Sequence, residues 1–220
     1  MPLPDEALRI EGGCNCNAVR YLVDIPTRDK RPLHPLAPTE AHVPMPFLAL
    51  DHCNDCRRAT ASILPAWVCA PLDMCSVSLV AASSATLAPK AAAREGQAKE
   101  EGGPWTPAAD VFTATAAASG DSFLTSYESS HERWRWFCAR CGTNVAYTAA
   151  MPAGFPSMLD ITLGSVDRRY LDSEALVPER HLWWDYGIDW IRRLATKGYG
   201  ELPVHPDYRI AETVDLQQDS

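Results

Sequence analysis

The amino-acid sequence predicts a mainly β protein with a single domain, residues 1–220, that carries long inserted loops and few short helices. The length supports one domain, because 220 residues with 46% hydrophobic side chains can bury one core without disulfide bonds. The pattern supports the β class, because short β-branched and aromatic runs lie between turn residues. The sequence contains no internal repeat of fixed period, which argues against a repeat architecture.

The first half of the chain contains two predicted strands. Residues 18–25 (AVRYLVDI) are β-branched and aromatic, which favours a strand. Residues 26–46 carry many prolines, and we expect a loop there because proline removes a backbone donor. The short apolar run 47–50 ends at a cysteine cluster. Residues 63–70 (ILPAWVCA) predict the second strand, in which Pro65 indicates an edge position or a bulge.

The second half begins with a change of composition. Alanine, serine, glycine, glutamate and lysine dominate residues 81–119, where we expect an inserted loop, and residues 89–103 within it are expected to be exposed. Four strand-like runs follow, at residues 123–127, 134–137, 144–148 and 159–163. An aromatic-rich segment spans residues 181–190, and residues 191–197 are predicted to be helical. The motif-bearing core therefore extends from about residue 10 to residue 190, interrupted by the loops at 26–46 and 81–119.

The charge of the chain bears on its partners and its location. Its net charge of −8 at pH 7, with no cluster of lysine and arginine, argues against nucleic acid and anionic membranes as partners. The first six residues lack the basic and apolar regions of a signal peptide, and no run of about 18 apolar residues predicts a membrane span. We expect a cytoplasmic protein that acts on a small molecule. Its paired cysteines are then more often metal ligands or catalytic thiols than disulfides.

Two cysteine pairs at opposite ends of the motif-bearing core predict a structural zinc site. Cys14 and Cys16 form a CxC pair, and Cys138 and Cys141 form a CxxC pair followed by Gly142. The second pair has the pattern of a zinc knuckle, in which a glycine with positive φ lets backbone amides turn toward the sulfurs. A structural zinc requires four ligands, so the two pairs together would join distant parts of the chain. The alternatives are free core cysteines or a redox CxxC, although no βαβ pattern surrounds the pair.

A third cluster lies in residues 51–58 (DHCNDCRR) and is the candidate catalytic site. A metal ion could bind here to Cys53, Cys56 and Asp51, or alternatively to the two cysteines and His52. Three ligands leave one position open, as a catalytic zinc needs. Arg57 follows directly and could bind a substrate carboxylate. The alternative is a charged surface turn that happens to contain two cysteines.

Several other residues are predicted to have structural roles. Cys69 and Cys75 lie in apolar or turn surroundings and are predicted to be small buried side chains. His181 is expected to be hydrogen-bonded and partly buried. Three tryptophans are expected to belong to the core or to a pocket wall: Trp183, Trp184 and Trp190.

Taken in order, these motifs resemble the glutathione-dependent formaldehyde-activating enzyme family, also called the centromere protein V family. The resemblance covers residues 10–190 and rests on ordered motifs: GGCNCNAVRY at 12–21, DHCNDCRR at 51–58, YESS at 127–130, RWFCARCGT at 135–143, TLGSVD at 162–167 and PERHLW at 178–183. It implies a zinc-stabilised β-tent fold, a structural zinc on the four paired cysteines and a second zinc at the middle cluster. In the family that second metal has three thiolate ligands and is linked to thiol-adduct binding and carbon–sulfur lyase chemistry.

The sequence departs from the family pattern at three places. Asp51 stands where the family has the first thiolate of the middle cluster, Asn17 replaces a glycine after Cys16, and Ala61-Ser62 replaces a Gly-Ser pair. A carboxylate is a harder ligand than a thiolate. The middle cluster therefore either holds a weaker, more Lewis-acidic zinc or is empty and serves another purpose.

Three functions compete at this point. The first is a zinc-dependent enzyme with carbon–sulfur lyase or thiol-adduct chemistry, acting on a small molecule such as a glutathione adduct. The second is a metabolite-tailoring enzyme (a dehydratase, cyclase or isomerase) with only the structural zinc and acid–base catalysis by Asp51, Asp55 or His52. The third is a non-enzymatic binding module. The zinc content of the purified protein distinguishes the first two functions. The sequence makes no prediction of the oligomeric state.

Overall fold

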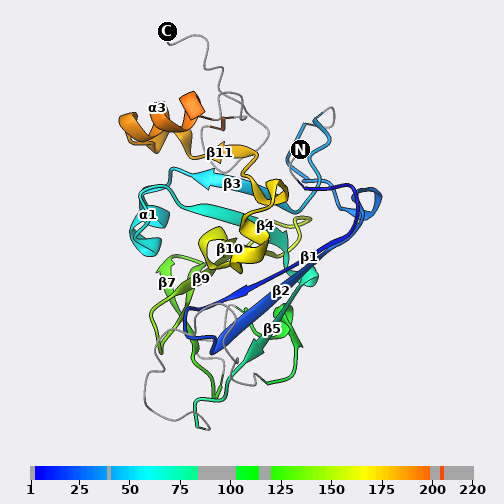
Figure 1. Cartoon of the computed structure of the whole chain (residues 1–220), viewed down its shortest axis with the longest axis vertical. Helices are drawn as coiled ribbons and strands as arrows, with labels where there is room; N and C mark the ends of the chain where they lie inside the picture. Colours follow the sequence, from blue (N-terminus) through cyan, green and yellow to red (C-terminus); the bar gives the residue numbers. More distant parts are fainter. Residues whose placement is uncertain (1–2, 39–40, 84–102, 114–119, 199–203, 206–220) are drawn as a thin grey trace.

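A computed structural model describes residues 3–38, 41–83, 103–113, 120–198 and 204–205. In this part of the chain two β-sheets dominate, which confirms the mainly β prediction (Figure 1). The larger sheet has seven strands, in the order β11 (Arg180–Leu182), β3 (Phe47–Asp51), β4 (Ala66–Pro71), β10 (Met158–Thr162), β9 (Asn144–Ala149), β8 (Arg133–Cys138) and β7 (Leu124–Ser130). Its neighbours are antiparallel, except that β11 runs parallel to β3.

The smaller sheet has four antiparallel strands, in the order β1 (Leu8–Gly13), β2 (Val19–Ile25), β5 (Cys75–Leu79) and β6 (Thr106–Pro107). Strand β2 lies inside this sheet, and six of its seven residues are buried, among them Arg20. Side chains from both sheets meet in one core, which includes Ile10, Tyr21, Leu48, Trp136 and Ile161.

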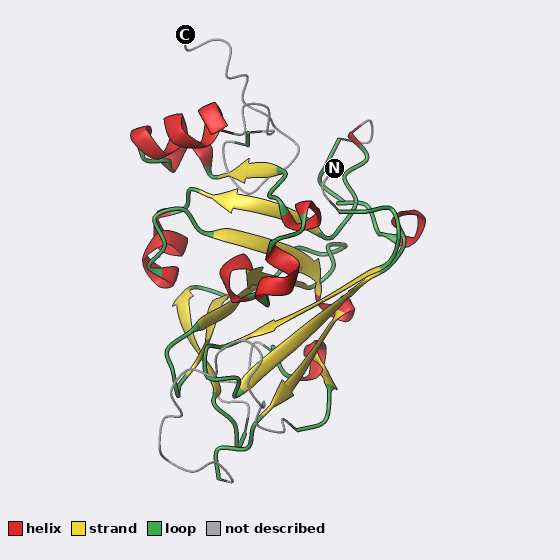
Figure 2. Ribbon diagram, in the orientation of Figure 1, coloured by secondary structure: helices red, strands yellow, loops and turns green. Residues whose placement is uncertain are grey.

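The helices are short and lie outside the sheets (Figure 2). The α-helices are α1 (Asn54–Thr60), α2 (Arg168–Leu171) and α3 (Asp189–Gly198). Single 3₁₀ turns are η1 (Arg28–Lys30), η3 (Leu72–Met74), η4 (Ala108–Asp110), η5 (Leu163–Ser165), η6 (Glu174–Leu176) and η7 (Trp184–Tyr186). Helix α1 follows β3 after two residues, so both cysteines of the middle cluster lie at the helix: Cys53 is its N-cap and Cys56 is within it.

All six predicted strands are present, with one correction at Pro65. The run 63–70 forms β4, but the strand begins only at Ala66 and lies inside the sheet between β3 and β10. Pro65 is therefore neither at a sheet edge nor in a bulge. It precedes the strand, where its carbonyl accepts the Asp51 amide at 2.8 Å and no N–H is required of it.

The insertion at 81–119 requires a second correction. Residues 84–102 and 114–119 lie outside the described part of the chain. The described segment between them, residues 103–113, is not all loop, because β6 extends the smaller sheet and Ala108 and Phe112 are buried. Phe112 packs edge-on against Trp136 of the core, with ring centroids 4.9 Å apart. This part of the insertion therefore belongs to the core.

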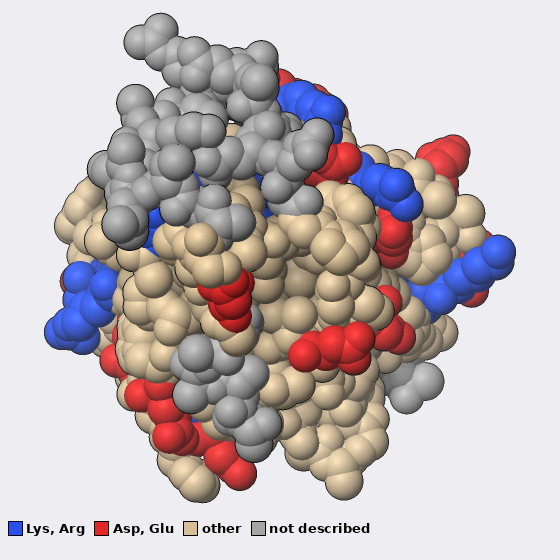
Figure 3. All heavy atoms as spheres, turned by 90° about the horizontal axis from the view of Figure 1, so that it is seen from below, with Lys and Arg blue, Asp and Glu red and all other residues tan. Residues whose placement is uncertain are grey.

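The described surface carries charges of both signs. On the face drawn in Figure 3, acidic and basic side chains lie in small separate groups around an uncharged surface. No helix of the described residues is long and apolar enough to cross a membrane.

Candidate metal centres and cavity

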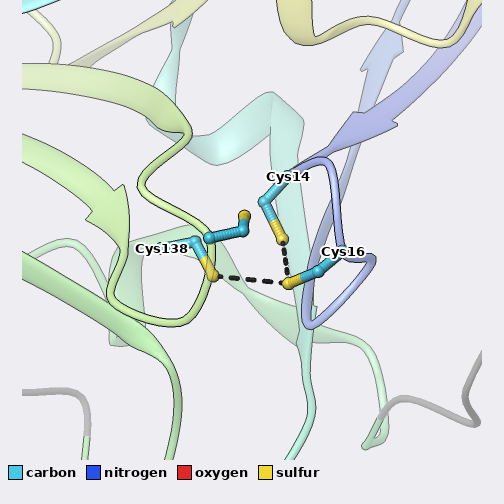
Figure 4. Close-up of side chains that lie close together, drawn as sticks. Cys14, Cys16 and Cys138 are labelled. Atoms are coloured by element: carbon cyan, nitrogen blue, oxygen red, sulfur yellow. Dashed lines mark hydrogen bonds between the residues drawn. The ribbon is translucent and has the colours of Figure 1, made fainter. Parts of the chain in front are cut away.

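The two distant cysteine pairs come together between the sheets. Cys14 and Cys16 lie in the turn that joins β1 to β2, Cys138 ends β8, and Cys141 lies in the turn between β8 and β9. The four sulfurs lie within 4.8 Å of one another. The Cys14 and Cys16 sulfurs are 3.5 Å apart, and those of Cys16 and Cys138 are 3.7 Å apart (Figure 4). This group could hold a metal ion, as predicted from the spacing.

Local backbone geometry explains why these turns present their sulfurs to one another. Gly142 has a φ of +76°, as predicted, and its amide donates to the Cys138 carbonyl at 2.8 Å. Asn17 has a φ of +59° in the first turn, a conformation that asparagine tolerates better than most residues. The Val19 amide donates to the Cys14 sulfur at 3.3 Å. The two turns are also joined by the Asn15 amide, which donates to the Thr143 hydroxyl at 3.1 Å.

The sulfur spacing fits tetrahedral thiolate coordination. A metal–sulfur distance near 2.3 Å in a tetrahedron places sulfurs about 3.8 Å apart. The two measured separations lie close to this value and far beyond a disulfide bond, which requires about 2.05 Å. A hydrogen bond from Cys14, assisted by backbone N–H groups, lowers the pKa of Cys138 to about 5, so this turn already favours a thiolate.

The second candidate centre contains Asp51, Cys53 and Cys56, whose ligand atoms also lie within 4.8 Å of one another. Asp51 ends β3 and is 4% exposed. One of its oxygens accepts the Cys53 amide at 2.8 Å, and the other accepts the Trp67 indole N–H at 2.9 Å. Burial raises the pKa of Asp51, and its hydrogen bonds, among them those from Cys53 and Trp67, counteract part of that shift.

An arginine completes this centre, and sequence reasoning missed its role. Arg135 of β8 is buried, and its Nη1 donates to the Cys56 sulfur at 3.3 Å. Its Nε donates to the Ser129 hydroxyl at 3.3 Å, and its guanidinium covers the Tyr147 ring at 4.4 Å from the centroid. The positive charge of Arg135 therefore offsets part of the negative charge that three ionised ligands would bring into a buried site.

The second centre opens into a cavity of about 560 Å³, which lies within the size range of small-molecule sites. Asp51, Cys53 and Cys56 line it, whereas none of the four paired cysteines does. Asp160 of β10 also lines the cavity, and burial raises the pKa of this carboxyl to about 7. No sequence motif marks Asp160, because it lies in an ordinary apolar strand and is brought to Asp51 only by sheet pairing.

The other predicted site residues lie outside this cavity. The His52 Nε2 and His181 Nδ1 atoms are 3.0 Å apart, and both rings pack against Trp184. Burial lowers the pKa of His52 and of His181 to about 4, so both are neutral at pH 7. Arg57 lies on α1 and does not line the cavity. Their placement gives no support to the prediction that His52 and Arg57 act on a substrate here.

The remaining interpretations have mixed outcomes. Cys69 and Cys75 are buried, as predicted, although Cys69 also lines the cavity. His181 is hydrogen-bonded and buried, as predicted. Trp183 lines the cavity and Trp184 is buried, but the prediction for Trp190 is wrong, because this side chain is 53% exposed on α3.

Comparison with known proteins adds no assignment: no protein-family model matches the chain, and no curated protein matches its sequence.

Proposed function

We propose that the chain is a zinc-dependent enzyme that acts on a small organic molecule by carbon–sulfur lyase or thiol-adduct chemistry. One observation carries this proposal: a set of three metal-binding residues, Asp51, Cys53 and Cys56, lines a cavity of small-molecule size. Three protein ligands leave one position of a tetrahedral zinc open, which is the arrangement of catalytic sites. The four-cysteine group lies away from the cavity and matches a closed structural site.

The donor atoms support zinc at both centres. Thiolates select zinc over magnesium or calcium, which prefer oxygen ligands. Zinc at the second centre would act as a Lewis acid on a substrate sulfur or oxygen. The family resemblance gains support from two turns, because Asn17 and Ala61 both have positive φ at positions where the family pattern has glycine. A β-tent fold for this chain is part of the same proposal.

The residues of the cavity suit the opening of a thiol adduct of an aldehyde. In that reaction the carbon–sulfur bond breaks, the carbon–oxygen bond becomes a carbonyl, and the hydroxyl proton moves to the sulfur. Asp160 is a half-buried carboxyl at the cavity that can take up this proton, since its pKa lies near neutrality. Arg135 lies beside the Cys56 sulfur and would stabilise negative charge that develops on the leaving sulfur.

Asp160 also favours a second candidate function. A half-buried carboxyl with a pKa of about 7 is suited to general acid–base catalysis without a second metal. A dehydratase, cyclase or isomerase that keeps only the structural zinc would use this carboxyl in the same cavity. The two candidates differ in the metal content of the active protein.

Metal analysis combined with a thiol assay tests the proposal. Purified wild-type protein is expected to contain close to two zinc ions per chain and to accelerate the loss of free thiol when glutathione is mixed with an aldehyde. The Cys53→Ser variant should retain about one zinc and its fold, and the reaction should fall to the uncatalysed rate.

Cys75→Ala is the matched control, because Cys75 is a buried thiol outside both metal centres. It should keep both zinc ions and the full rate. One zinc per chain in fully active wild-type protein would overturn the zinc-dependent mechanism and favour the acid–base alternative. Two zinc ions with no effect on any thiol adduct would overturn the lyase assignment.

A further inference from the structure

Aromatic side chains surround the cavity from segments that are far apart in the sequence. Phe47 and Trp67 come from β3 and β4, Tyr147 comes from β9, and Phe155 comes from the loop that precedes β10. Trp183 and Tyr186 approach from the C-terminal segment. Six aromatic side chains line this one cavity, and the Arg135 guanidinium covers one face of the Tyr147 ring. The other ring surfaces at the cavity are apolar, and such surfaces pair best with another planar π system.

The backbone at Trp183 supports a specific purpose for this wall. Trp183 has a φ of +58°, a left-handed conformation that bulky residues rarely adopt. Such strain persists only where the surrounding structure imposes it, and it is concentrated at functional sites. Here it accompanies an indole that lines the cavity and packs edge-on against Tyr186, with ring centroids 5.6 Å apart.

Two arginines supply the positive charge of the cavity, and they differ in the contacts that they already make with other side chains. Arg133 and Arg135 are two positions apart on β8, so their side chains lie on the same face of the sheet, and both line the cavity. Arg135 is buried and donates to Cys56 and Ser129. Arg133 is exposed and donates one N–H to the His131 carbonyl at 2.8 Å, and no carboxylate of the described residues forms an ion pair with it. Its planar fork is therefore available to an anion.

From these observations we infer that the organic part of the substrate is a planar aromatic or conjugated acid, with its ring between the aromatic walls and its carboxylate on Arg133. This inference rests on the proposed function, because it takes the cavity as the active site. Glutathione alone fits the cavity less well. It is a flexible, polar tripeptide without a ring, and it would gain little from six aromatic surfaces.

Binding of 2-naphthoate to the metal-loaded wild-type protein tests the inference. Trp67 and Trp183 line the cavity, so tryptophan fluorescence should change on binding, and calorimetry gives the dissociation constant. Three comparison probes separate the two parts of the ligand: 2-naphthylmethanol has the ring without the charge, adipate has charge without a ring, and glutathione has neither ring nor matched shape. We expect 2-naphthoate to bind most tightly and adipate and glutathione most weakly.

Two variants locate the ligand, and a third serves as control. Arg133→Gln should weaken 2-naphthoate binding about tenfold to a hundredfold, as expected for a hydrogen-bonded charge pair, and should leave 2-naphthylmethanol binding unchanged. Phe155→Leu should weaken both ring-containing probes by similar factors. Arg193→Gln removes an exposed arginine of α3 that does not line the cavity, and it should change neither affinity.

The outcomes distinguish this inference from the proposed function. Tighter binding of glutathione than of 2-naphthoate would overturn the inference, and so would an Arg133→Gln variant that binds 2-naphthoate as well as wild type, because the carboxylate would then rest on the metal or elsewhere. The expected binding pattern in a protein with one zinc and no thiol-adduct activity would support the inference about the ligand and overturn the lyase mechanism alone.

Discussion

At the scale of single residues, the second candidate metal centre depends on Asp51. Its carboxylate has the geometry of a ligand, but both of its oxygens are also acceptors, one for the Cys53 amide and one for the Trp67 indole. These two donors hold the side chain in place and favour its ionised form. Asp51 is thus held by two N–H donors, one for each carboxylate oxygen, which a single thiolate sulfur could not accept equally well.

Replacing Asp51 by asparagine should therefore affect both stability and metal binding. Asparagine keeps the size of the side chain but presents one oxygen and one NH₂ group, so either the Cys53 amide or the Trp67 indole loses its acceptor. We expect a loss of about 1–3 kcal/mol in the free energy of unfolding. We also expect the zinc content to fall by about one ion per chain, as measured by urea denaturation and elemental analysis.

Asp55→Asn is the matched control, because Asp55 lines the same cavity from α1 but lies outside the ligand group. It should leave both quantities near the wild-type values. An Asp51→Asn protein that retains two zinc ions would show that this carboxylate is not a ligand.

Residue-level prediction from sequence succeeds where the partners are close in the chain. Asp51, Cys53 and Cys56 lie within six residues, and the strand-to-helix turn brings them together as their spacing indicates. Arg135 and Asp160 could not be found in this way, because strand pairing across more than 75 residues brings them to the cavity. The second arginine of RWRW, Arg135, carries a usable signal. Side chains alternate along a strand, so an arginine between two tryptophans faces the side opposite to both of them.

At the scale of elements, a partly buried ion pair attaches the smaller sheet to the turn after β10. Both terminal nitrogens of Arg20 in β2 donate to the Asp167 carboxylate, at 2.8 and 2.7 Å. The Tyr21 hydroxyl is 2.8 Å from the Ser165 hydroxyl in the same region. These contacts give a structural role to the polar residues of two motifs that lie far apart in the sequence, VRY and GSVD, because the side chains of one motif bind those of the other.

Breaking this pair should be costly, because the Arg20 and Asp167 side chains are only 11% and 18% exposed. Arg20→Met should lower the free energy of unfolding by about 2 kcal/mol, since the partly buried Asp167 carboxylate loses both Arg20 hydrogen bonds while the Arg169 guanidinium stays 3.8 Å away. The double variant with Asp167→Asn should lose less than the sum of the single losses, and chemical denaturation of the four proteins gives the coupling energy.

The same sheet provides a control in Arg9 and Asp24, which also form a bidentate pair but are 62% and 51% exposed. Arg9→Met should cost less than about 1 kcal/mol. Equal losses at the two sites would show that the Arg20 pair contributes no more than a surface ion pair.

Prediction of elements failed for physical reasons that particular strands illustrate. The runs at 18–25 and 47–50 form β2 and β3. They could be recognised because most of their residues are apolar and are buried in the sheets. Strands β1 and β5 were not predicted: LRIEGG mixes charges with two glycines, and CSVSL alternates small polar residues with apolar ones. Both are held in the sheet by pairing with β2, which is a tertiary contact and leaves little trace in local sequence.

At the scale of the whole molecule, the four-cysteine group connects the two sheets. Cys14 and Cys16 belong to the β1–β2 turn of the smaller sheet, while Cys138 and Cys141 belong to the β8–β9 turn of the larger one. This long-range connection was predictable from ligand counting alone, because a closed tetrahedral site needs both pairs. The order of the strands was not, since no residue pattern specifies that β11 adds parallel to β3 or that β6 completes the smaller sheet.

A metal at this junction would be part of the folding free energy of the whole chain. Structural zinc sites bind with about 10–16 kcal/mol, whereas an entire domain is stable by about 5–15 kcal/mol.

Replacing Cys138 by serine removes a ligand whose surroundings favour a thiolate, so we expect the protein to lose cooperative unfolding or to precipitate. Near-ultraviolet circular dichroism and a thermal melt measure this loss, and Cys75→Ala, which removes a buried thiol away from both centres, should still melt cooperatively. Cys53→Ser should by contrast still melt cooperatively, because it removes a ligand only at the cavity. A Cys138→Ser protein that melts like wild type would show that the two sheets are held by their apolar core and the Arg20 pair without this centre.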